Sequence, residues 1–475
     1  MEFNADKYKI FDNILKNENY QNDEIIEIIG KALSVCSPFV WEKIDKILLS
    51  IITSNEEELK KECYNGIPDY LPSLRALIWK INLRYLSHDI KKWKSSLDLK
   101  RNEYLEIKKA FILRKKEEIK IFEEIENEKK MKEEKKKENN SEEEEKNNID
   151  EKKIKQDDNK NNNNNKEEFL TYLGQCTDKN LLELINKDIN RTRVDMNFFN
   201  SLANKDNKMT KEEQMKMLSF KNNCIYPNYK NVYIKGRDKI TVFENETHCD
   251  IIERILYIYS KLNKDVGYVQ GMNELIAPIY YCFCKDSNAN IENVEADTFW
   301  CFSLLMKDLK KLFLKENDVL KGGILDRIYL LDLIISKIIK DIYKTLLKKN
   351  VSTINYAISW VNLLFCQDLM MPDILRLWDI IFSEKDRLCF VYYFSMAILQ
   401  YKKKKIEDKT KDFSDLLIEI KSLQNENIEK IIDLAVKLKK NYEKKVNGII
   451  LDFDKKENKS KEIISKCQDS INKAK

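Results

Sequence analysis

The chain has 475 residues, and its 85 lysines and arginines nearly balance its 80 aspartates and glutamates, leaving a formal net charge of +5. This balance argues against a nucleic-acid-binding protein, because contacts with a phosphate backbone require an excess of basic side chains. Only nine glycines and six prolines interrupt the chain. Leucine, isoleucine, lysine and glutamate are abundant, so we expect an all-α protein with long helices.

The cysteines and histidines argue against a metal site. Eleven cysteines are scattered along the chain, and the close pair Cys282 and Cys284 does not have the spacing of zinc ligands. Two histidines, His88 and His248, argue against a histidine metal site or a histidine-based catalytic triad. The apolar runs are shorter than the roughly 20 residues of a membrane span, and residues 1–15 lack the pattern of a signal peptide. We therefore expect a cytoplasmic protein.

The first part of the chain is predicted to be helical. Residues 1–62 carry apolar side chains three or four positions apart, which indicates an N-terminal helical extension. The break at Gly66-Ile67-Pro68 precedes another helix, for which Ser73 is the expected N-cap. Arg75 and Trp79 lie four positions apart on that helix and share a face. We expect a structural role for both, because a tryptophan is more often buried in the core than placed in a site.

Two long polar segments follow. Residues 115–166 are almost wholly Lys, Glu, Asn and Asp, and cannot bury enough apolar surface to offset an ordering entropy of about 1 to 2 kcal/mol per residue. We predict a charged, low-complexity insert that is disordered; a partner-binding segment is the alternative. Residues 200–245 are predicted to form a long loop, with a small hairpin in the stretch 232–243.

The second half of the chain continues as amphipathic helices. Helical spacing of apolar residues predicts Ile251–Leu262, Glu295–Leu314 and Leu325–Leu347. The stretch Tyr356–Leu369 is apolar nearly all round, which is typical of a buried central helix. Pro372 suits the first turn of the helix after it.

The C-terminal residues 406–475 are predicted to form further helices and a polar tail. One of these helices is expected over Asn427–Leu438. Before this segment, another helix is expected over Leu388–Tyr401. Residues 402–405 are four lysines at the end of the earlier helix. They are open to two interpretations, a contact with acidic lipid or a solvated helix end.

The stretch Ile185–Thr192 (INKDINRT) sets an acidic residue before a basic one. Asp188 precedes Arg191 by three residues, so on a helix both side chains project from one face. Taken alone, such a pair is most often an exposed ion pair worth a few tenths of a kcal/mol.

The stretch Gly267–Glu274 (GYVQGMNE) gathers polar groups at a junction between two helices. A glutamine amide such as that of Gln270 can both accept from and donate to a water molecule, and Gly271 allows another backbone to approach closely. The simpler alternative is that Gln270 caps the next helix.

Together these stretches resemble the two signature motifs of the TBC domain family of Rab GTPase-activating proteins, I-x-x-D-x-x-R-T and Y-x-Q-G-M. Every defined position is filled here. Two flanking blocks agree: residues 66–80 resemble the family's G-I-P and R-x-x-x-W element, and residues 369–382 resemble its L-P-D-x-L-R-x-W-D-x-L-F helix. The segments GYVQGMNELIAPIYY and EADTFWCF are similar to the branch called TBC domain family member thirteen.

The resemblance implies a large helical domain of two halves, which we place at residues 63–405. It implies a Rab protein in its GTP form as partner, with Arg191 as an arginine finger and Gln270 as the residue that orients the attacking water. The chain would need no cofactor of its own, since GTP and Mg²⁺ belong to the partner, and it has no P-loop motif. It would turn over no substrate of its own and act as an activator.

The resemblance also implies roles for neighbouring residues. Asp188 and Thr192 would hold the arginine segment, while Tyr268, Gly271 and Asn273 would shape the glutamine loop.

A second group of matching residues is expected to be structural. Trp378 and Asp379 in the late helix would join Arg75 and Trp79 in that role. One position departs from the family, because Ser359 precedes the tryptophan of the central helix where many members carry arginine. Whatever that arginine does elsewhere is in doubt here.

Three functions remain open from the sequence. The first is an active Rab GTPase-activating protein in vesicle trafficking and intracellular protein transport, associated peripherally with endomembranes through its partner. The second is a TBC-fold scaffold that binds a Rab without accelerating hydrolysis. The third is a helical structural protein built around the Lys/Glu segment, which lacks the sustained heptads that such a protein needs. The intact Arg191 and Gln270 favour the first.

Overall fold

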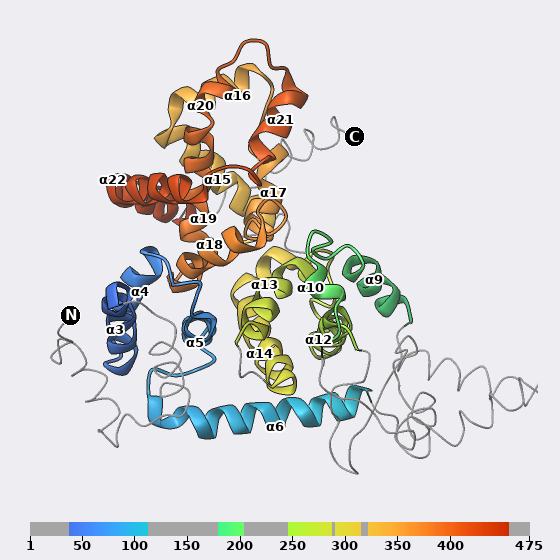
Figure 1. Ribbon diagram of the computed structural model, residues 1–475. Coiled ribbons are helices and arrows are strands. Elements are labelled where there is room, and N and C mark those ends of the chain that lie inside the picture. The colour runs from blue at the N-terminus through green and yellow to red at the C-terminus, as the bar shows by residue number, and fades with distance from the viewer. Residues whose placement is uncertain (1–37, 113–178, 204–245, 287–289, 315–321, 456–475) are drawn as a thin grey trace, which may run out of the picture. The chain divides into compact units, whose positions relative to one another are not determined.

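The computed structural model describes residues 38–112, 179–203, 246–286, 290–314 and 322–455 (Figure 1). Every regular element in these ranges is a helix, and the β structure found there is one isolated antiparallel bridge between Leu202 and Thr247. The prediction of an all-α fold is confirmed. The predicted insert at 115–166 and the predicted hairpin at 232–243 lie outside the described residues, as does most of the predicted N-terminal extension.

The chain forms two compact units. Unit 1 comprises Met1–Arg101 and Tyr259–Lys475, and unit 2 comprises Asn102–Ile258. Helix α6 (Trp93–Ile112) crosses the first boundary in the chain, and α12 (His248–Leu262) crosses the second. The domain limits expected from the sequence, at residues 63 and 405, stay a prediction.

Unit 1 begins with α3 (Pro38–Ile52) and α4 (Glu56–Tyr64), which pack together. The side chain of Asn55 accepts a hydrogen bond from the Glu58 N–H (3.1 Å) and so caps α4. Three glutamates in the first turn of α4 add favourable charge at the positive end of the helix dipole.

The next helix, α5 (Pro72–Asn82), starts earlier than its sequence suggested. Its N-cap is Leu71, and Pro72 fills the first turn, where the missing N–H of a proline costs no hydrogen bond. The expectation that Ser73 caps this helix is therefore wrong. Ser73 lies inside the helix, is buried, and donates a hydrogen bond to Asp286 Oδ1 (2.7 Å).

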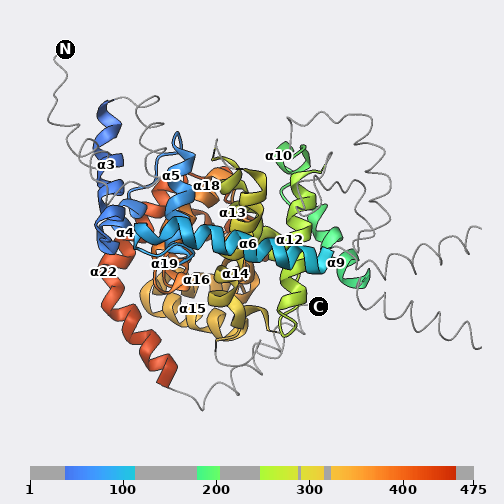
Figure 2. The ribbon, with the colours of Figure 1, turned by 90° about the horizontal axis from the view of Figure 1, so that it is seen from below.

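Helix α19 (Arg387–Tyr401) is the central element of unit 1. All residues from Phe390 to Leu399 are buried, and α19 contacts helices on several sides. Its longest neighbour is α22 (Ile428–Lys455), which Figures 1 and 2 show beside it. The sequence indicated a helix only over Asn427–Leu438; the added turns bury Val446 and Ile449. Unit 1 also contains α13 (Met272–Cys284), α14 (Ile291–Phe313), α18 (Met371–Ser383), α20 (Lys403–Ile406) and α21 (Phe413–Lys421), with a 3-10 turn at Ile90–Lys92.

Two helices predicted as long are broken. The expected Leu325–Leu347 helix is divided into α15 (Ile324–Ile338) and α16 (Lys340–Lys348), because Ile339 leaves the helical conformation. The expected Tyr356–Leu369 helix is α17 (Ile354–Asn362), which ends where two residues adopt a left-handed backbone.

Those two residues, Leu364 and Phe365, have φ angles of 48° and 67° and are fully buried. An apolar turn at this depth has the same composition as an apolar helix, which is why the pattern misled. Pro372 lies in the first turn of α18, as predicted.

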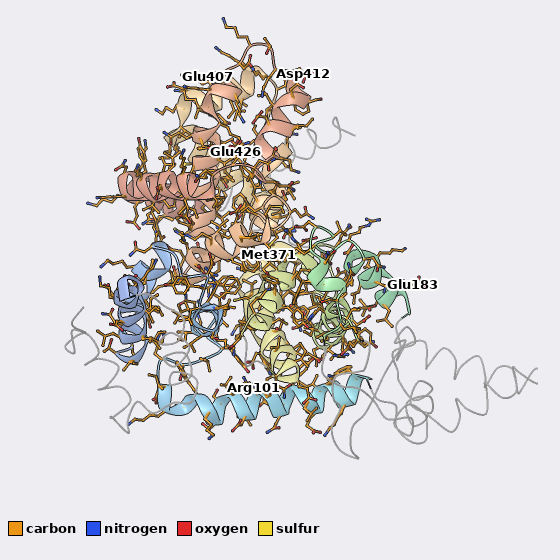
Figure 3. All side chains as sticks on the ribbon, viewed as in Figure 1. Arg101, Glu183, Met371, Glu407, Asp412 and Glu426 are labelled. Atoms are coloured by element: carbon orange, nitrogen blue, oxygen red, sulfur yellow. The ribbon has the colours of Figure 1, made fainter. Side chains whose placement is uncertain are left out.

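A buried ion cluster joins α5, α6 and α14. Asp297 on α14 is bonded by Lys80 Nζ (2.8 Å), by Arg101 Nη2 (2.8 Å) and by the Tyr85 hydroxyl (2.8 Å). Figure 3 labels Arg101 on α6. Burial opposes ionisation of the carboxyl, but the Lys80 and Arg101 charges outweigh it and lower the pKa of Asp297 to about 2. The cluster therefore remains charged at neutral pH.

The buried ammonium of Lys402 connects helices in the C-terminal part of unit 1. Lys402 is 1% exposed, and its Nζ donates to the carbonyls of Glu419 (2.6 Å) and Ser422 (2.7 Å) and to Glu426 Oε1 (3.1 Å). Lys402 is thus neither a lipid contact nor a solvated helix end. It ties the end of α19 to the segment that leads into α22.

Unit 2 contains α9 (Lys179–Ile189), α10 (Asn197–Asn200) and most of α12. Thr247 and Asp250 cap α12 reciprocally: the Thr247 N–H donates to the Asp250 carboxylate (2.8 Å), and the Asp250 N–H donates to the Thr247 hydroxyl (3.3 Å). Asn186 on α9 donates to Glu253 on α12 (3.3 Å). These contacts fix α9, and the turn that follows it, onto α12.

In the part of the chain that the structure describes, no helix is both long enough and apolar enough to cross a membrane.

Candidate functional site

Arg191 lies in a tight turn directly after α9. The helix ends at Ile189, and backbone bonds close the turn: the Arg191 N–H donates to the Asp188 carbonyl (3.0 Å) and the Thr192 N–H to the Ile189 carbonyl (2.9 Å). Arg193 follows with a φ of 46°. A residue with a side chain keeps this left-handed conformation only where its surroundings impose it, so the turn has a defined backbone.

Asp188 and Thr192 flank Arg191 and are both buried, 5% and 2% exposed. The Thr192 hydroxyl donates to the Asp188 carbonyl (3.0 Å), which ties the residue after Arg191 to the last turn of α9. This geometry agrees with a positioning role for the two residues. That role stays a prediction.

The Arg191 side chain is exposed. The expectation that Asp188 and Arg191 share one helix face is wrong, because the helix ends between them and only Asp188 is buried. Within the described residues the Arg191 guanidinium has neither a hydrogen bond nor an ion pair. None of the described residues engages its five N–H donors.

Gln270 lies in the loop between α12 and α13 and is also exposed. Backbone bonds fix this loop on both sides: the Gly267 N–H donates to the Asn263 carbonyl (2.7 Å), and the Met272 N–H donates to the Val269 carbonyl (3.1 Å). The Gln270 amide has no hydrogen-bond partner among the residues that the structure describes.

The residue after it, Gly271, is the N-cap of α13. A glycine has no side chain to cap with, and Gln270 does not bond the helix, so the interpretation of Gln270 as a cap is wrong. Tyr268 and Asn273 are 9% and 3% exposed, and the Tyr268 hydroxyl lies 3.5 Å from Asn273 Oδ1. Both side chains lie under the loop, while the side chain of Gln270 does not.

Gly271 is required by its conformation and by its neighbour. Its φ is 99°, which residues with a Cβ rarely adopt, and a Cβ there would lie 2.9 Å from Leu363 Cδ2. The close approach expected at this glycine is therefore made by a side chain and not by another backbone. No feature of the sequence distinguishes Leu363 from the other leucines.

The residues predicted as structural form one buried cluster in unit 1. Arg75 on α5 donates to both carboxylate oxygens of Asp379 on α18 (3.1 and 3.2 Å) and to the carbonyl of Ile67 (2.8 Å). Trp79 Nε1 donates to the same carboxylate (2.8 Å), and its ring lies 5.9 Å from that of Trp378. Arg75 and Trp79 on α5 and Trp378 and Asp379 on α18 are therefore buried against one another.

Ser359, where the family often has arginine, donates a hydrogen bond to Asp368 Oδ2 (3.0 Å). Burial raises the pKa of Asp368 to about 6, and the Ser359 bond opposes part of that rise. The hydrogen-bond donor to this buried carboxyl is therefore a neutral hydroxyl.

The described residues contain no group of three or more His, Cys, Asp or Glu side chains that could hold a metal ion.

Comparison with known protein families gives a match over the second of the two motif regions. A model of the Rab-GTPase-TBC domain matches residues 200–407 of the chain. In this span the chain is similar to the TBC domain family. The matched span of the TBC domain includes Gln270 and begins after Arg191.

Two relatives match over most of the length of the chain. TBC1 domain family member 13 of Homo sapiens is 26% identical over 412 residues, which cover 81% of this chain and 93% of that protein. TBC1 domain family member 13 of Mus musculus is 27% identical over 375 residues, covering 72% and 84%.

The TBC fold itself is supported by a solved structure. The crystal structure of the Ypt/Rab-GAP domain of Gyp1p superposes with a TM-score of 0.54 and 17% sequence identity, over 92% of this chain and 99% of that chain. At this identity the likeness concerns the fold alone.

Proposed function

We propose that this TBC domain protein accelerates GTP hydrolysis by a Rab-type small GTPase in its GTP form. Arg191 and Gln270 act in trans, the first as an arginine finger and the second as the residue that orients the attacking water. GTP and Mg²⁺ come with the partner. Binding to the partner also brings the protein to the endomembrane that carries that partner.

One observation carries the proposal: Arg191 is exposed and has no partner among the described residues, on a turn whose backbone is defined by its own hydrogen bonds. An arginine used to stabilise this protein would have its donors engaged, as those of Arg75 are. Exposed arginines with engaged side chains also occur here, such as Arg84, which pairs with Asp308.

The chemistry of phosphoryl transfer suits such a group. Negative charge spreads over the γ-phosphate and leaving oxygens in the transition state, so a guanidinium inserted there binds the transition state more strongly than the ground state. Fingers of this kind contribute about 10³ to 10⁵ in rate, or about 4 to 7 kcal/mol. A lysine would supply the charge but not the planar fork of donors.

Gln270 supplies the second requirement. Its amide carries a carbonyl that accepts a hydrogen bond from the attacking water and an NH₂ that donates one to a phosphate oxygen. Because the loop backbone is fixed on both sides of Gln270, binding a partner costs little ordering of this segment.

The test is single-turnover phosphate release from a panel of GTP-loaded Rab proteins. Wild type should accelerate release from at least one Rab, and Arg191→Ala and Gln270→Ala should each lose that acceleration. Lys187→Ala, an exposed cation on α9, and Gln367→Ala, an exposed glutamine, are the matched controls and should retain it.

Two results would replace the proposal. Rab binding without acceleration by the wild type would make the chain a TBC-fold scaffold. Acceleration that survives both finger substitutions would move the chemistry to other residues.

A further inference from the structure

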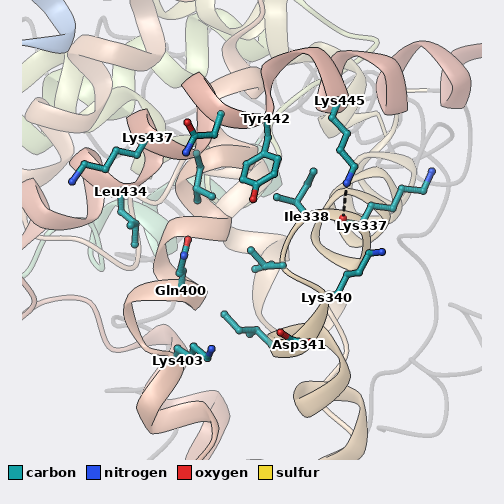
Figure 4. Close-up of a pocket in the computed structure, with 14 residues that line it drawn as sticks. Lys337, Ile338, Lys340, Asp341, Gln400, Lys403, Leu434, Lys437, Tyr442 and Lys445 are labelled. Atoms are coloured by element: carbon teal, nitrogen blue, oxygen red, sulfur yellow. Dashed lines mark hydrogen bonds between the residues drawn. The ribbon is translucent and has the colours of Figure 1, made fainter.

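A hollow of about 620 Å³ opens on unit 1. It is enclosed by the junction of α15 and α16, the end of α19 with the start of α20, and the middle of α22 (Figure 4). No residue of the finger segments or of the Arg75 cluster lines it.

The lining of the hollow is strongly basic. It contains the five lysines Lys337, Lys340, Lys403, Lys437 and Lys445 and a single carboxylate, Asp341, so its formal charge is 5 − 1 = +4. All five lysine side chains are exposed. Like charges gathered round one concavity repel one another, and a bound anion relieves that repulsion.

The lysines are not neutralised by the described part of the chain. Lys403 has an ion pair with Glu407 at 3.7 Å. Lys445 donates to the carbonyl of Lys337 (3.2 Å), which holds its ammonium beside the hollow. Among the described residues, Lys337, Lys340 and Lys437 have no ion pair.

Neutral donors complete the lining. The amides of Gln400 and Asn441 and the hydroxyl of Tyr442 lie among the lysines, and Figure 4 shows Tyr442 near the middle of the group. The N-terminus of α16 also borders the hollow, and its N-cap, Ile339, makes no side-chain bond to the first turn. The free N–H groups of a helix N-terminus favour an anion, which adds to the effect of the lysines.

We propose that this hollow binds a compact, multiply phosphorylated anion of the inositol phosphate class, either as a lipid headgroup or as the free molecule. Several lysines around one concave site match several phosphates on one small ring, and lysine is a point-charge partner for phosphate. A nucleic acid would need a basic strip with aromatic platforms. The apolar side chains of Ile338, Leu434 and Leu438 in the lining suit the carbon ring of the ligand.

The test uses the full chain without any GTPase. Binding of soluble inositol trisphosphate is measured by calorimetry, and binding of phosphatidylcholine vesicles with and without phosphatidylinositol bisphosphate is measured by sedimentation. One variant replaces Lys337, Lys340 and Lys437 by Gln together, and a second replaces the same three by Arg. The control replaces Lys307, Lys385 and Lys430, which are exposed and do not line the hollow, by Gln.

The Gln variant should bind roughly 100-fold more weakly, since each lysine near clustered phosphates contributes on the order of a tenfold change or less. The Arg variant and the control should bind like the wild type, and binding should weaken as salt rises. Binding to bisphosphate vesicles identifies a lipid headgroup, and binding of the soluble trisphosphate alone identifies a free ligand.

The proposal is overturned if the wild type binds neither probe, or if the control loses as much affinity as the Gln variant. It is also overturned if an acidic peptide binds at the hollow and inositol trisphosphate does not displace it. Circular dichroism verifies that the variants are folded, which is expected because all the substituted side chains are exposed.

Discussion

Arg75 and Arg191 both lie in stretches that resemble one family, and the structure treats them in opposite ways. Arg75 is 4% exposed, and its donors are bonded to Asp379 and to the Ile67 carbonyl. Arg191 is exposed and has no partner among the described residues. A buried guanidinium must have its bonds completed within the protein, whereas an exposed one is hydrated until a ligand arrives. Burial therefore separates an arginine that stabilises the fold from one available to an incoming phosphate.

The largest effect is expected from substituting the exposed Arg191, and it should concern the rate of GTP hydrolysis and not the stability of the fold. Arg191→Ala should lower the stimulated GTPase rate by about 10³ to 10⁵, while the free energy of unfolding changes by less than about 0.5 kcal/mol. Phosphate release and urea unfolding of the same preparations measure the two quantities. A loss of stability comparable to the loss of activity would end the distinction between the two arginines.

The buried arginine should show the reverse. Asp379→Asn removes the buried counterion of Arg75 and leaves only the exposed carboxylate of Asp69 as its ion-pair partner among the described residues. We expect a loss of about 3 kcal/mol of stability in denaturant unfolding, at the low end for breaking a buried pair. The control is Arg84→Ala, which breaks an exposed pair with Asp308 and should cost about 0 to 1 kcal/mol. Equal costs for the two variants would contradict the assigned role of Arg75.

Asp368 sharpens the comparison, because it is a buried carboxyl bonded by Ser359 and not by an arginine. Its pKa is raised by burial to about 6, above the ordinary 3.8, so its ionisation opposes folding. The stability of the wild type is complete below the unfolded pKa and falls as pH rises through the folded one.

Asp368→Asn removes that penalty and should stabilise the protein by up to about 3 kcal/mol above the folded pKa, with little gain near pH 4. Denaturant unfolding at acidic and mildly basic pH measures the difference. The exposed Asp433→Asn serves as control. A gain that does not depend on pH would show that the carboxyl is not the titrating group.

The smallest effect concerns the glutamine loop. Gly271→Ala must adopt a φ of 99° against Leu363, and should cost about 1 to 3 kcal/mol of stability. Gly267→Ala also requires a positive φ, 63°, but meets nothing within 4 Å, so only about 1 kcal/mol is expected. If the two variants unfold alike, contact with Leu363 does not shape the loop.

Much of the fold was predictable because it depends on local patterns. Apolar spacing located helices such as α12 and α19, and Pro372 marked the start of α18. The errors occurred where a nonlocal contact decided the backbone. No residue near Ile339 signals that the helix is interrupted there. The turn at Leu364 and Phe365 is as apolar as the helix before it.

The motifs named the candidate residues of the site but not the geometry in which the structure places them. The motif pointed to Arg191 and Gln270, but placed Arg191 on a helix, because the left-handed conformation of Arg193 that accompanies the turn has no signal in the residue types. The contact of Leu363 with Gly271 joins positions about ninety residues apart, which one sequence does not reveal.

The hydrogen bonds of the buried Lys402 ammonium predict how a C-terminal truncation would affect this protein. Its ammonium is satisfied by groups at positions 419, 422 and 426, all beyond residue 407, where the match to the family domain stops. A fragment trimmed to that match would retain the cation, lose every acceptor named for it, and uncover the side of α19 on which α22 packs. The C-terminal segment is thus an indispensable part of the folding unit, and a recombinant fragment that omits it is expected to be insoluble.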